Sequence, residues 1–171
     1  QATLSFTGQT QDGNNNTAHI GNYDYMWADA ETPSDGNATF HFKHKISLVK
    51  ITLSVPETAT YTKLTFSGTD AVFAESATMA IADGVLTLGT QKRSTSLTLN
   101  NISLSKGDNL VAWLSVCPND FGKEETFTAI LADSDNKTYN FNFDKTLSGF
   151  SAGSAYAFAG ELNVDIVFED D

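Results

Sequence analysis

Hydrophobic and polar side chains alternate with a period of two along most of the chain, which is typical of half-buried β-strands. One alternating run covers Ala38–Leu48, and the apolar phase then slips by one residue at Leu48–Val49. A slip of one residue turns every following side chain to the other face, so it predicts a β-bulge or a strand that crosses between two sheets. The run continues to Val55 and ends at Pro56, because proline has no N–H for a ladder.

Shorter alternating runs follow, separated by turn residues. They predict strands at Tyr61–Ser67, Thr78–Ala82, Val85–Leu88, Ser94–Leu99, Ile102–Leu104, Leu110–Cys117, Glu125–Leu131, Lys137–Phe143 and Tyr156–Phe168. Asp83-Gly84, Asn100-Asn101 and Asp133–Asn136 are the expected turns between neighbouring strands. The run Leu110–Cys117 is apolar on both faces, which indicates a central strand that is covered on both sides.

This pattern predicts an all-β antiparallel sandwich of about seven to ten strands, and no segment shows a capped helical stripe. We expect a single domain over residues 1–171. Within it, residues 1–21 are interpreted as an edge strand followed by a loop, since Gln9–Asn22 is rich in Asn, Gly and Gln, and residues 22–168 as the sandwich.

Composition and charge argue against several classes of partner and site. The 171 residues carry 10 Lys and Arg against 21 Asp and Glu, a formal charge of −11, which argues against nucleic acid or an anionic membrane as partners. No apolar run reaches the ~20 residues of a transmembrane helix. The single cysteine, Cys117, excludes an intramolecular disulfide and a cysteine-cluster metal site, and a buried free thiol is expected there.

The remaining candidate chemistry is sparse. His41 and His44 are three residues apart on an expected strand and so face opposite sides, and His19 is remote in sequence, which argues against a histidine metal site. Asp133–Asn136 has alternate carboxylates but lacks the full calcium-loop pattern, so a plain hairpin turn is favoured. The sequence contains no nucleophile elbow. We therefore expect no catalytic residue, no metal, no cofactor and no enzymatic activity.

Two runs carry alternative interpretations. The C-terminal residues Leu162, Val164, Ile166 and Phe168 alternate on one face. They are either the last core strand of the domain or a donor strand offered to a neighbouring molecule, and Ala2–Thr7 is open to the same two interpretations. Tyr23, Tyr25 and Trp27 are alternate residues, so they form either part of the core or an aromatic platform for a ligand such as a sugar. Trp113 is expected in the core.

Three segments resemble one known family, the fimbrillin-like surface proteins of Bacteroides-type bacteria. Phe40–Leu53 resembles the family's opening strand, with matches at Phe42, His44, Ile46, Val49, Ile51 and Leu53. Asp24–Asp29 is similar to the aspartate-aromatic segment that precedes this strand. Ser151–Val164 is similar to the closing strand, with matches at Gly153, Tyr156 and Phe158. Together the segments cover about residues 22–166.

The resemblance implies a transthyretin-like, Greek-key type of sandwich in an exported lipoprotein at the cell surface or outer membrane. Members of the family serve as subunits of surface fimbriae (pili) and join by β-strand exchange. We therefore expect a non-enzymatic fimbrial subunit or accessory adhesin whose partners are other pilin-like subunits. The alternative function is an extracellular module that binds a host or bacterial glycan or protein through the aromatic platform. The chain begins at Gln1 without a leader-like segment, so we expect a removed export segment with an N-terminal lipid anchor as the contact with membrane.

Overall fold

The structure is a computed structural model that describes residues 1–33 and 35–162. These residues form sixteen strands and one short 3-10 helix, η1 (Ala18–Asn22). The strands are β1 (Ala2–Ser5), β2 (Thr10–Asp12), β3 (Met26–Trp27), β4 (Lys43–His44), β5 (Ser47–Ser54), β6 (Ala59–Gly68), β7 (Phe73–Ala74), β8 (Ser76–Met79), β9 (Leu86–Leu88), β10 (Gln91–Lys92), β11 (Ser94–Asn100), β12 (Ser103–Leu104), β13 (Asn109–Val116), β14 (Asn119–Asp133), β15 (Thr138–Phe150) and β16 (Ala155–Leu162). The all-β prediction is confirmed.

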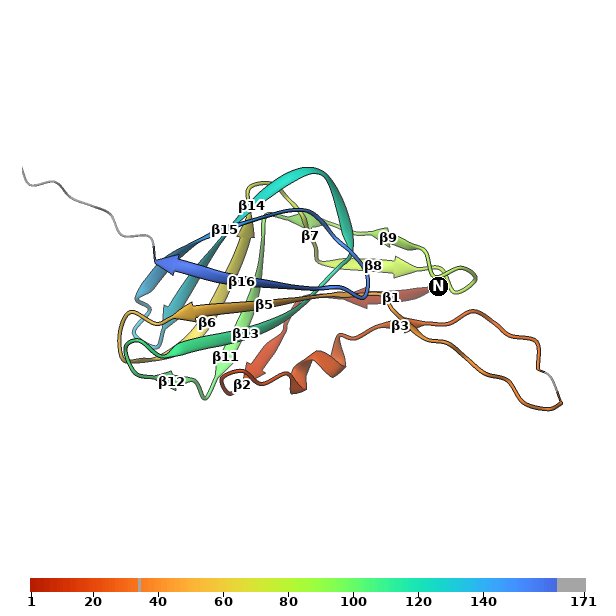
Figure 1. The fold of residues 1–171 in the computed structure, drawn as a ribbon, viewed down its shortest axis with the longest axis horizontal. Coiled ribbons are helices and arrows are strands. Elements are labelled where there is room, and N and C mark those ends of the chain that lie inside the picture. The colour runs from red at the N-terminus through yellow and green to blue at the C-terminus, as the bar shows by residue number, and fades with distance from the viewer. Residues whose placement is uncertain (34, 163–171) are drawn as a thin grey trace, which may run out of the picture.

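One large sheet forms the body of the molecule (Figure 1). Its strand order is β13-β5-β16-β15-β14-β6-β11-β2, and β12 also pairs with β6. β5 pairs with β16 in parallel and with β13 antiparallel, while β11 pairs with β2 in parallel. The sheet curls until β2 and β13, its two edge strands, lie close together, so the architecture is a nearly closed sandwich. No helix in the described part of the chain is long and apolar enough to cross a membrane.

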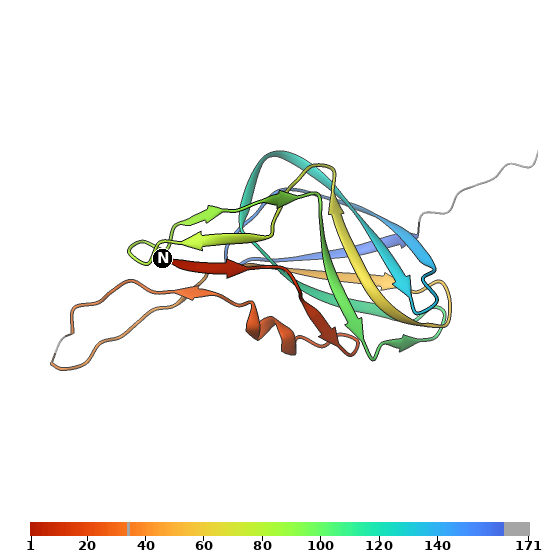
Figure 2. The same cartoon turned by 180° about the vertical axis from the view of Figure 1, so that it is seen from behind.

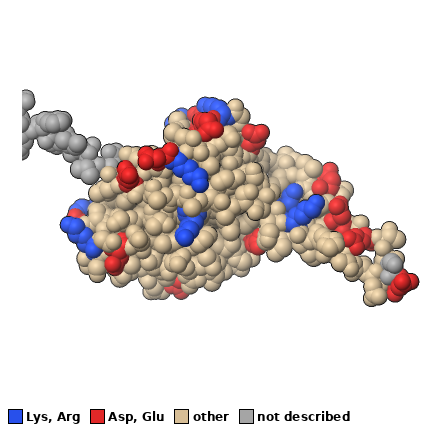
Figure 3. Space-filling model, viewed as in Figure 1, with Lys and Arg blue, Asp and Glu red and all other residues tan. Residues whose placement is uncertain are grey.

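A smaller sheet and a long arm extend from one end of this body (Figures 1 and 2). The smaller sheet has the order β1-β8-β9 and contains the N-terminus. The arm consists of β3, β4 and the loop residues 28–42 between them. Its visible face carries several acidic side chains, with basic side chains near its base, whereas charges of both signs are interspersed over the body (Figure 3).

Two apolar clusters stabilise these parts. The main sheet encloses a phenylalanine cluster whose ring centroids lie 5.1–6.3 Å apart; its members are Phe66, Phe73, Phe127, Phe143, Phe150 and Phe158. Leu4, Phe6 and Ile46 belong to a second cluster beneath the smaller sheet. Full burial of each phenylalanine contributes roughly 1.5–3 kcal/mol, so the first cluster supplies much of the driving force for closing the sheet.

The prediction of a continuous strand over Ala38–Leu48 is wrong. Residues 38–42 are in the loop of the arm, and the side chains of Phe40 and Phe42 are 51% and 64% exposed. The alternation did not predict this, because the arm extends away from the body and residues 38–42 are all exposed (Figure 1). The predicted change of face at Leu48–Val49 is confirmed: Ile46 and Leu48 pack in the second cluster, and Val49 belongs to the first.

Candidate functional site

The most unusual feature of the main sheet is that two neighbouring strands come apart. β15 and β16 are consecutive antiparallel strands, yet in the described residues they pair only through Phe141 with Leu162 and Asn142 with Glu161. From there they diverge toward the turn at residues 151–154 (Figure 1). We call this unpaired region, between residues 146–150 of β15 and 155–159 of β16, the split.

A bulge in β15 causes the split. Thr126 of β14 lies opposite Thr146, and Thr128 lies opposite Asn142, so Phe143–Lys145 all stand opposite Phe127 alone. Extra residues on one strand bend it and increase its twist. β15 therefore follows β14 away from β16, while β16 stays in register with β5 along Ala155–Gly160.

Both edges of the split carry backbone groups that no backbone partner in the described chain satisfies. Leu48 N of β5 donates to Ser154 O, just before β16, at 2.9 Å. In a parallel ladder every second residue of a strand bonds to the same neighbour, so the even-numbered residues of β16 bond to β5. The N–H and C=O groups of Ala155, Ala157 and Ala159 therefore point into the split.

The same reasoning gives the direction of the backbone groups on the β15 edge. Thr126 O accepts from Thr69 N at 3.2 Å on the β6 side, so Glu125 faces β15 and pairs with Leu147. The backbone groups of the neighbouring Thr146 and Ser148 consequently turn toward β16. Two free strand edges thus face each other across the split.

Two side chains bridge it. Lys145 Nζ donates to Ala157 O at 3.1 Å and lies 5.4 Å from the ring centroid of Phe158. Ser151 N donates to the Tyr156 hydroxyl at 2.8 Å. Burial alone would raise the pKa of Tyr156, but the hydrogen bonds with Ser151 and the nearby Lys145 hold that pKa below its ordinary value.

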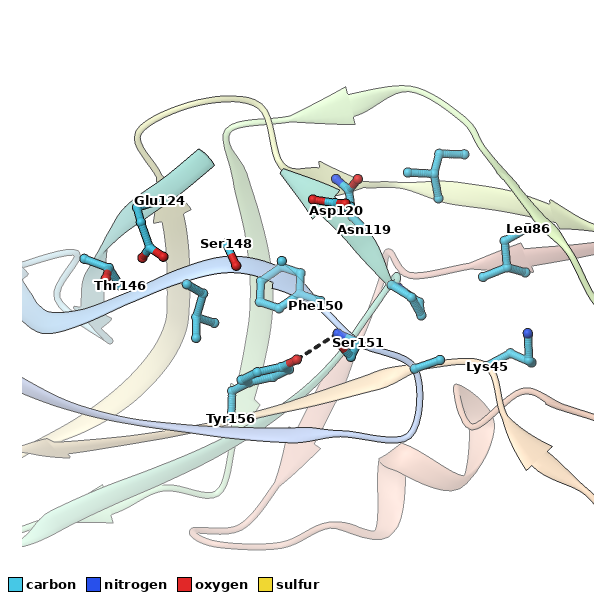
Figure 4. A pocket seen from close by; sticks show the side chains of 15 residues that line it. Lys45, Leu86, Asn119, Asp120, Glu124, Thr146, Ser148, Phe150, Ser151 and Tyr156 are labelled. Carbon is cyan, nitrogen blue, oxygen red and sulfur yellow. Dashed lines mark hydrogen bonds between the residues drawn. The ribbon is translucent and has the colours of Figure 1, made fainter. Parts of the chain in front are cut away.

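A depression of about 810 Å³ lies over the mouth of the split (Figure 4). Tyr156 and Thr146 come from the two strands of the split, Lys45 and Leu86 from the side of the arm and β9, and Glu124 from β14. Its lining combines backbone edges, a few apolar side chains and charges of both signs. Such a surface suits an extended polypeptide better than a compact apolar ligand.

β14 also contains a bulge where it lines the depression. Between Asp120, opposite Gly149, and Glu125, opposite Leu147, four residues of β14 stand opposite Ser148. Lys123 forms an ion pair with Asp70, and the hydrogen bond from the lysine lowers the pKa of the Asp70 carboxyl. The buried Glu125 accepts from Asp70 N at 3.1 Å, which ties the bulge to the loop after β6.

The other incomplete junction of the sheet lies between β2 and β13, and there side chains replace a backbone ladder. Gln9 Nε2 donates to Ser115 O at 2.7 Å, and Gln9 Oε1 accepts from Ser115 N at 2.9 Å. Gln11 repeats this pattern, donating to Val111 O at 2.8 Å and accepting from Trp113 N at 2.9 Å. Both glutamine side chains are buried.

The next residues complete this set of contacts, which we call the amide seam. Asn14 Oδ1 accepts from Val111 N at 2.8 Å, and Asn15 N donates to Val111 O at 3.0 Å. His19 Nε2 lies 2.8 Å from Trp113 O, so this nitrogen carries the proton. Every outward N–H and C=O of Val111, Trp113 and Ser115 therefore has a partner, and the β13 edge is closed to further strands.

Comparisons with known proteins agree with this architecture. The family model described as "Fimbrillin-like" matches residues 1–169. The chain belongs to the fimbrillin-like family.

One solved structure shows a similar fold. A candidate cell adhesion protein from Bacteroides uniformis superposes with a TM-score of 0.57 at 15% identity, over 95% of this chain and 65% of the other. A second candidate cell adhesion protein, from Bacteroides ovatus, gives 0.48 at 14% identity, over 78% of this chain and 49% of the other. The fimbrillin-like chain thus spans about half to two thirds of the length of these proteins. A search of curated proteins finds no match.

The predicted donor run is only partly described. β16 ends at Leu162, whose side chain is 39% exposed, and Val164, Ile166 and Phe168 lie outside the described residues. The other predicted edge segment, Ala2–Thr7, contains β1, which pairs with β8 of its own chain. The donor role of the C-terminal run therefore stays a prediction.

Two residues of the aromatic row, Tyr25 and Trp27, pack against the second apolar cluster. The Tyr25 hydroxyl donates to Ser5 O at 2.9 Å, and Trp27 Nε1 donates to Ile81 O at 2.8 Å. Gly84, in the β8–β9 turn at φ +71°, leaves room for the indole, since a Cβ there would lie 2.6 Å from the Trp27 ring. Tyr23 is half-buried like its two neighbours. A ligand platform at these residues stays a prediction.

The other candidate residues have local partners. His44 Nδ1 lies 2.7 Å from Asp24 Oδ1, and in the described part of the chain no group of three His, Cys, Asp or Glu could hold a metal. Asp133 Oδ1 accepts from the backbone N–H of Asp135 and Lys137, which makes residues 133–136 a hairpin turn. Cys117 is a buried free thiol, and burial raises its pKa to about 12.

Sequence reasoning missed both the split and the amide seam. One feature of the sequence could have indicated the seam. Gln9 and Gln11 are two residues apart, like the apolar residues Leu4 and Phe6 before them, which is the spacing of side chains on one face of a strand. We interpreted that segment as a loop because of its composition. The bulge at Phe143–Lys145 had no signal, because its position depends on the register with another strand.

Proposed function

We propose that this fimbrillin-like chain is an exported subunit or accessory adhesin of a cell-surface fimbria that joins its neighbours by β-strand addition. The observation that carries the proposal is the end of β16. The described part of β16 reaches Leu162 at the end of the body opposite the N-terminus and the arm, and the apolar side chain of Leu162 is partly exposed. In the sequence the same alternation continues through Val164, Ile166 and Phe168.

This arrangement supports a donor role because an apolar alternating run needs a surface to cover one of its faces. The described part of the sandwich already has a filled core, and β5 and β15 already flank β16. An open sheet edge of a neighbouring subunit would supply both the backbone partners and the apolar cover. The candidate cell adhesion protein of similar fold, of which the chain spans 65%, is consistent with such a surface role.

Truncation after Leu162 tests the proposal. The truncation is introduced into the complete gene. We expect cells that express the truncated protein to lose filaments in immunogold electron microscopy. The purified truncated chain should lose its higher oligomers in size-exclusion chromatography and keep the circular dichroism spectrum of the untruncated chain. A matched pair of substitutions tests whether assembly depends on the apolar face of the C-terminal run and not only on the length of that run. Ile166→Asp should abolish assembly, whereas Val167→Asp, on the opposite face, should not. Normal filaments from the truncated chain would contradict the proposal.

Export is tested separately. Radiolabelled palmitate should be incorporated into the product of the complete gene, and surface proteolysis of intact cells should remove it. A product that stays protected inside intact cells would contradict surface display.

A further inference from the structure

We propose that the arm binds the arm of a second copy of the chain, with phenylalanine rings of each arm packed into a small apolar pocket at the base of the other. The contact does not use the C-terminal run and goes beyond the proposed function. Its first support is where apolar surface is exposed. Seven large apolar side chains of the described residues are exposed, and five belong to the arm and the adjoining β8–β9 turn: Met26, Phe40, Phe42, Ile81 and Val85. Such a concentration marks an interaction surface.

A pocket of about 150 Å³ lies where the arm joins the body. Leu48 of β5 and Ala155 of β16 line it, and these residues stand opposite each other in the register of the two strands. Ile20 and Ile46 complete an aliphatic lining, and His44 adds its imidazole ring. An aliphatic cavity of roughly this size holds a benzene-sized ring, so the pocket fits the side chain of a phenylalanine.

Phe40 and Phe42 project on the same side of the chain as the pocket. His44, Ile46 and Leu48 are alternate residues that line the pocket, and the two phenylalanines occupy the preceding positions of the same alternation. Alternate residues of an extended segment share a face, and the ring centroids of Phe40 and Phe42 lie only 6.5 Å apart. Both rings are exposed and neither lines the pocket of its own chain, so a ring from another molecule is needed to fill it.

This placement makes the contact reciprocal. Phe40 and Ile46 are six positions apart, about 20 Å of extended chain, so ring and pocket belong to one continuous surface. Two copies whose arms run in opposite directions can therefore exchange rings at both pockets at once. Because each copy uses the same surface, the contact closes as a two-fold dimer and adds no further copies.

The charges of the arm fit the same arrangement. The loop of the arm carries Asp29, Glu31 and Asp35, whereas Lys43 and Lys45 lie at its base (Figure 3). None of the ion pairs among the described residues involves these five side chains. Arms that run in opposite directions bring the acidic part of each toward the basic base of the other. A second copy thus offers both the apolar fit and the charge complementarity.

The ring is tested with Phe40→Ser. Phe40 is exposed and belongs to neither apolar cluster, so the melting temperature should stay at the value of the parent chain. All chains carry Ile166→Asp, so that association through the C-terminal run does not contribute. We expect a monomer–dimer equilibrium in analytical ultracentrifugation that is at least tenfold weaker for Phe40→Ser. His41→Ser, at the adjacent position on the other side of the arm, should leave it unchanged. A parent chain that stays monomeric at every concentration would overturn the proposal.

The pocket is tested from its other wall. Ala155→Leu fills the pocket with the chain's own side chain and should weaken the dimer at least tenfold. Ala157→Leu is the matched control, because Ala157 is equally exposed on the same face of β16 but does not line the pocket. A dimer that is weakened by Phe40→Ser but not by Ala155→Leu would place the rings elsewhere and overturn the assignment of the pocket.

Cysteine pairing measures the contact directly. Chains with Phe40→Cys are mixed with chains carrying Ala155→Cys, and mixed disulfide dimers should form faster than with Ala157→Cys. Equal rates at the two positions would count against the pocket. The other candidate occupant is a bilayer: a monomeric chain that floats with phosphatidylcholine vesicles, and loses this binding with Phe40→Ser, would overturn self-association.

The two proposals fail separately. If truncation after Leu162 leaves filaments intact, strand addition is wrong, and the dimer of the Ile166→Asp chain still supports the arm contact. If the Phe40→Ser chain dimerises like its parent, the arm contact is wrong and strand addition is unaffected.

Discussion

The amide seam and the split are two answers to the same structural problem. In both places a strand of the main sheet lacks a neighbour with which to form a regular ladder. At the seam, buried glutamine side chains satisfy the outward backbone groups of β13. At the split, Lys145 donates to Ala157 O and the Tyr156 hydroxyl accepts from Ser151 N, and residues 146–150 of β15 line the depression.

The difference shows which edge the molecule keeps closed. A buried backbone group without a partner costs roughly 1–3 kcal/mol, so the glutamines of the seam are structural necessities. The edges of the split border an open depression where water can satisfy the same groups. The outward backbone groups of β13 therefore have partners within the chain, whereas those at the split have no backbone partner in the described residues.

The largest effect is expected from Gln11→Ala. Loss of this amide leaves Val111 O with a single partner and Trp113 N with none in a buried environment. We expect the free energy of unfolding, measured by urea denaturation, to fall by about 3 kcal/mol. Asn14→Ala, at an exposed position of the same seam, should cost about 1 kcal/mol. A loss for Gln11→Ala no larger than that for Asn14→Ala would show that the seam is not needed for closure.

Hydrogen exchange compares the two regions within one sample. The amides of Trp113 and Ser115 are bonded to buried side-chain oxygens, whereas those of Ala157 and Ala159 face the split. We expect at least about 100-fold slower exchange for the first pair by NMR, a difference of about 2.7 kcal/mol in opening free energy. Similar protection at both regions would remove the contrast.

Cys117 directly follows β13 and reports on that end of the seam. Burial raises the pKa of its thiol to about 12, so the unfolded chain loses this proton at a lower pH than the folded chain does. Stability is therefore unaffected well below pH 8 and falls as pH rises above the unfolded value, by about 1.4 kcal/mol per unit between about pH 9 and pH 10. Cys117→Ala should flatten that slope in urea denaturation, and an unchanged slope would mean that another group titrates in this range.

The smallest effect is expected from Lys145→Met. The lysine side chain is exposed, and its bond to Ala157 O can be replaced by water. We expect a change in unfolding free energy of about 0.5 kcal/mol, measured as for Gln11→Ala. A loss comparable to that of Gln11→Ala would mean that the split is held shut.

The sequence predicted the local parts of this fold and missed those that depend on distant partners. The turn at residues 133–136 follows from neighbouring residues and is confirmed. The prediction that Leu110–Cys117 is a central strand is wrong, because β13 is an edge strand of the main sheet whose outer side is covered by the amide seam. Alternation failed over Ala38–Leu48, since a period of two shows which face could be buried but not whether anything covers it. The split and the seam depend on register between strands, which no single stretch of residues encodes.

The length of the loop closed by the seam has a consequence for folding kinetics. Gln9 meets Ser115 across 106 positions of the chain. Contacts of such separation form late, because the entropy of closing the loop must be overcome before the contact contributes any energy. The β13 edge is therefore expected to stay open until late in folding, as is the pairing of β5 with β16, and a newly made chain is exposed to aggregation during this interval.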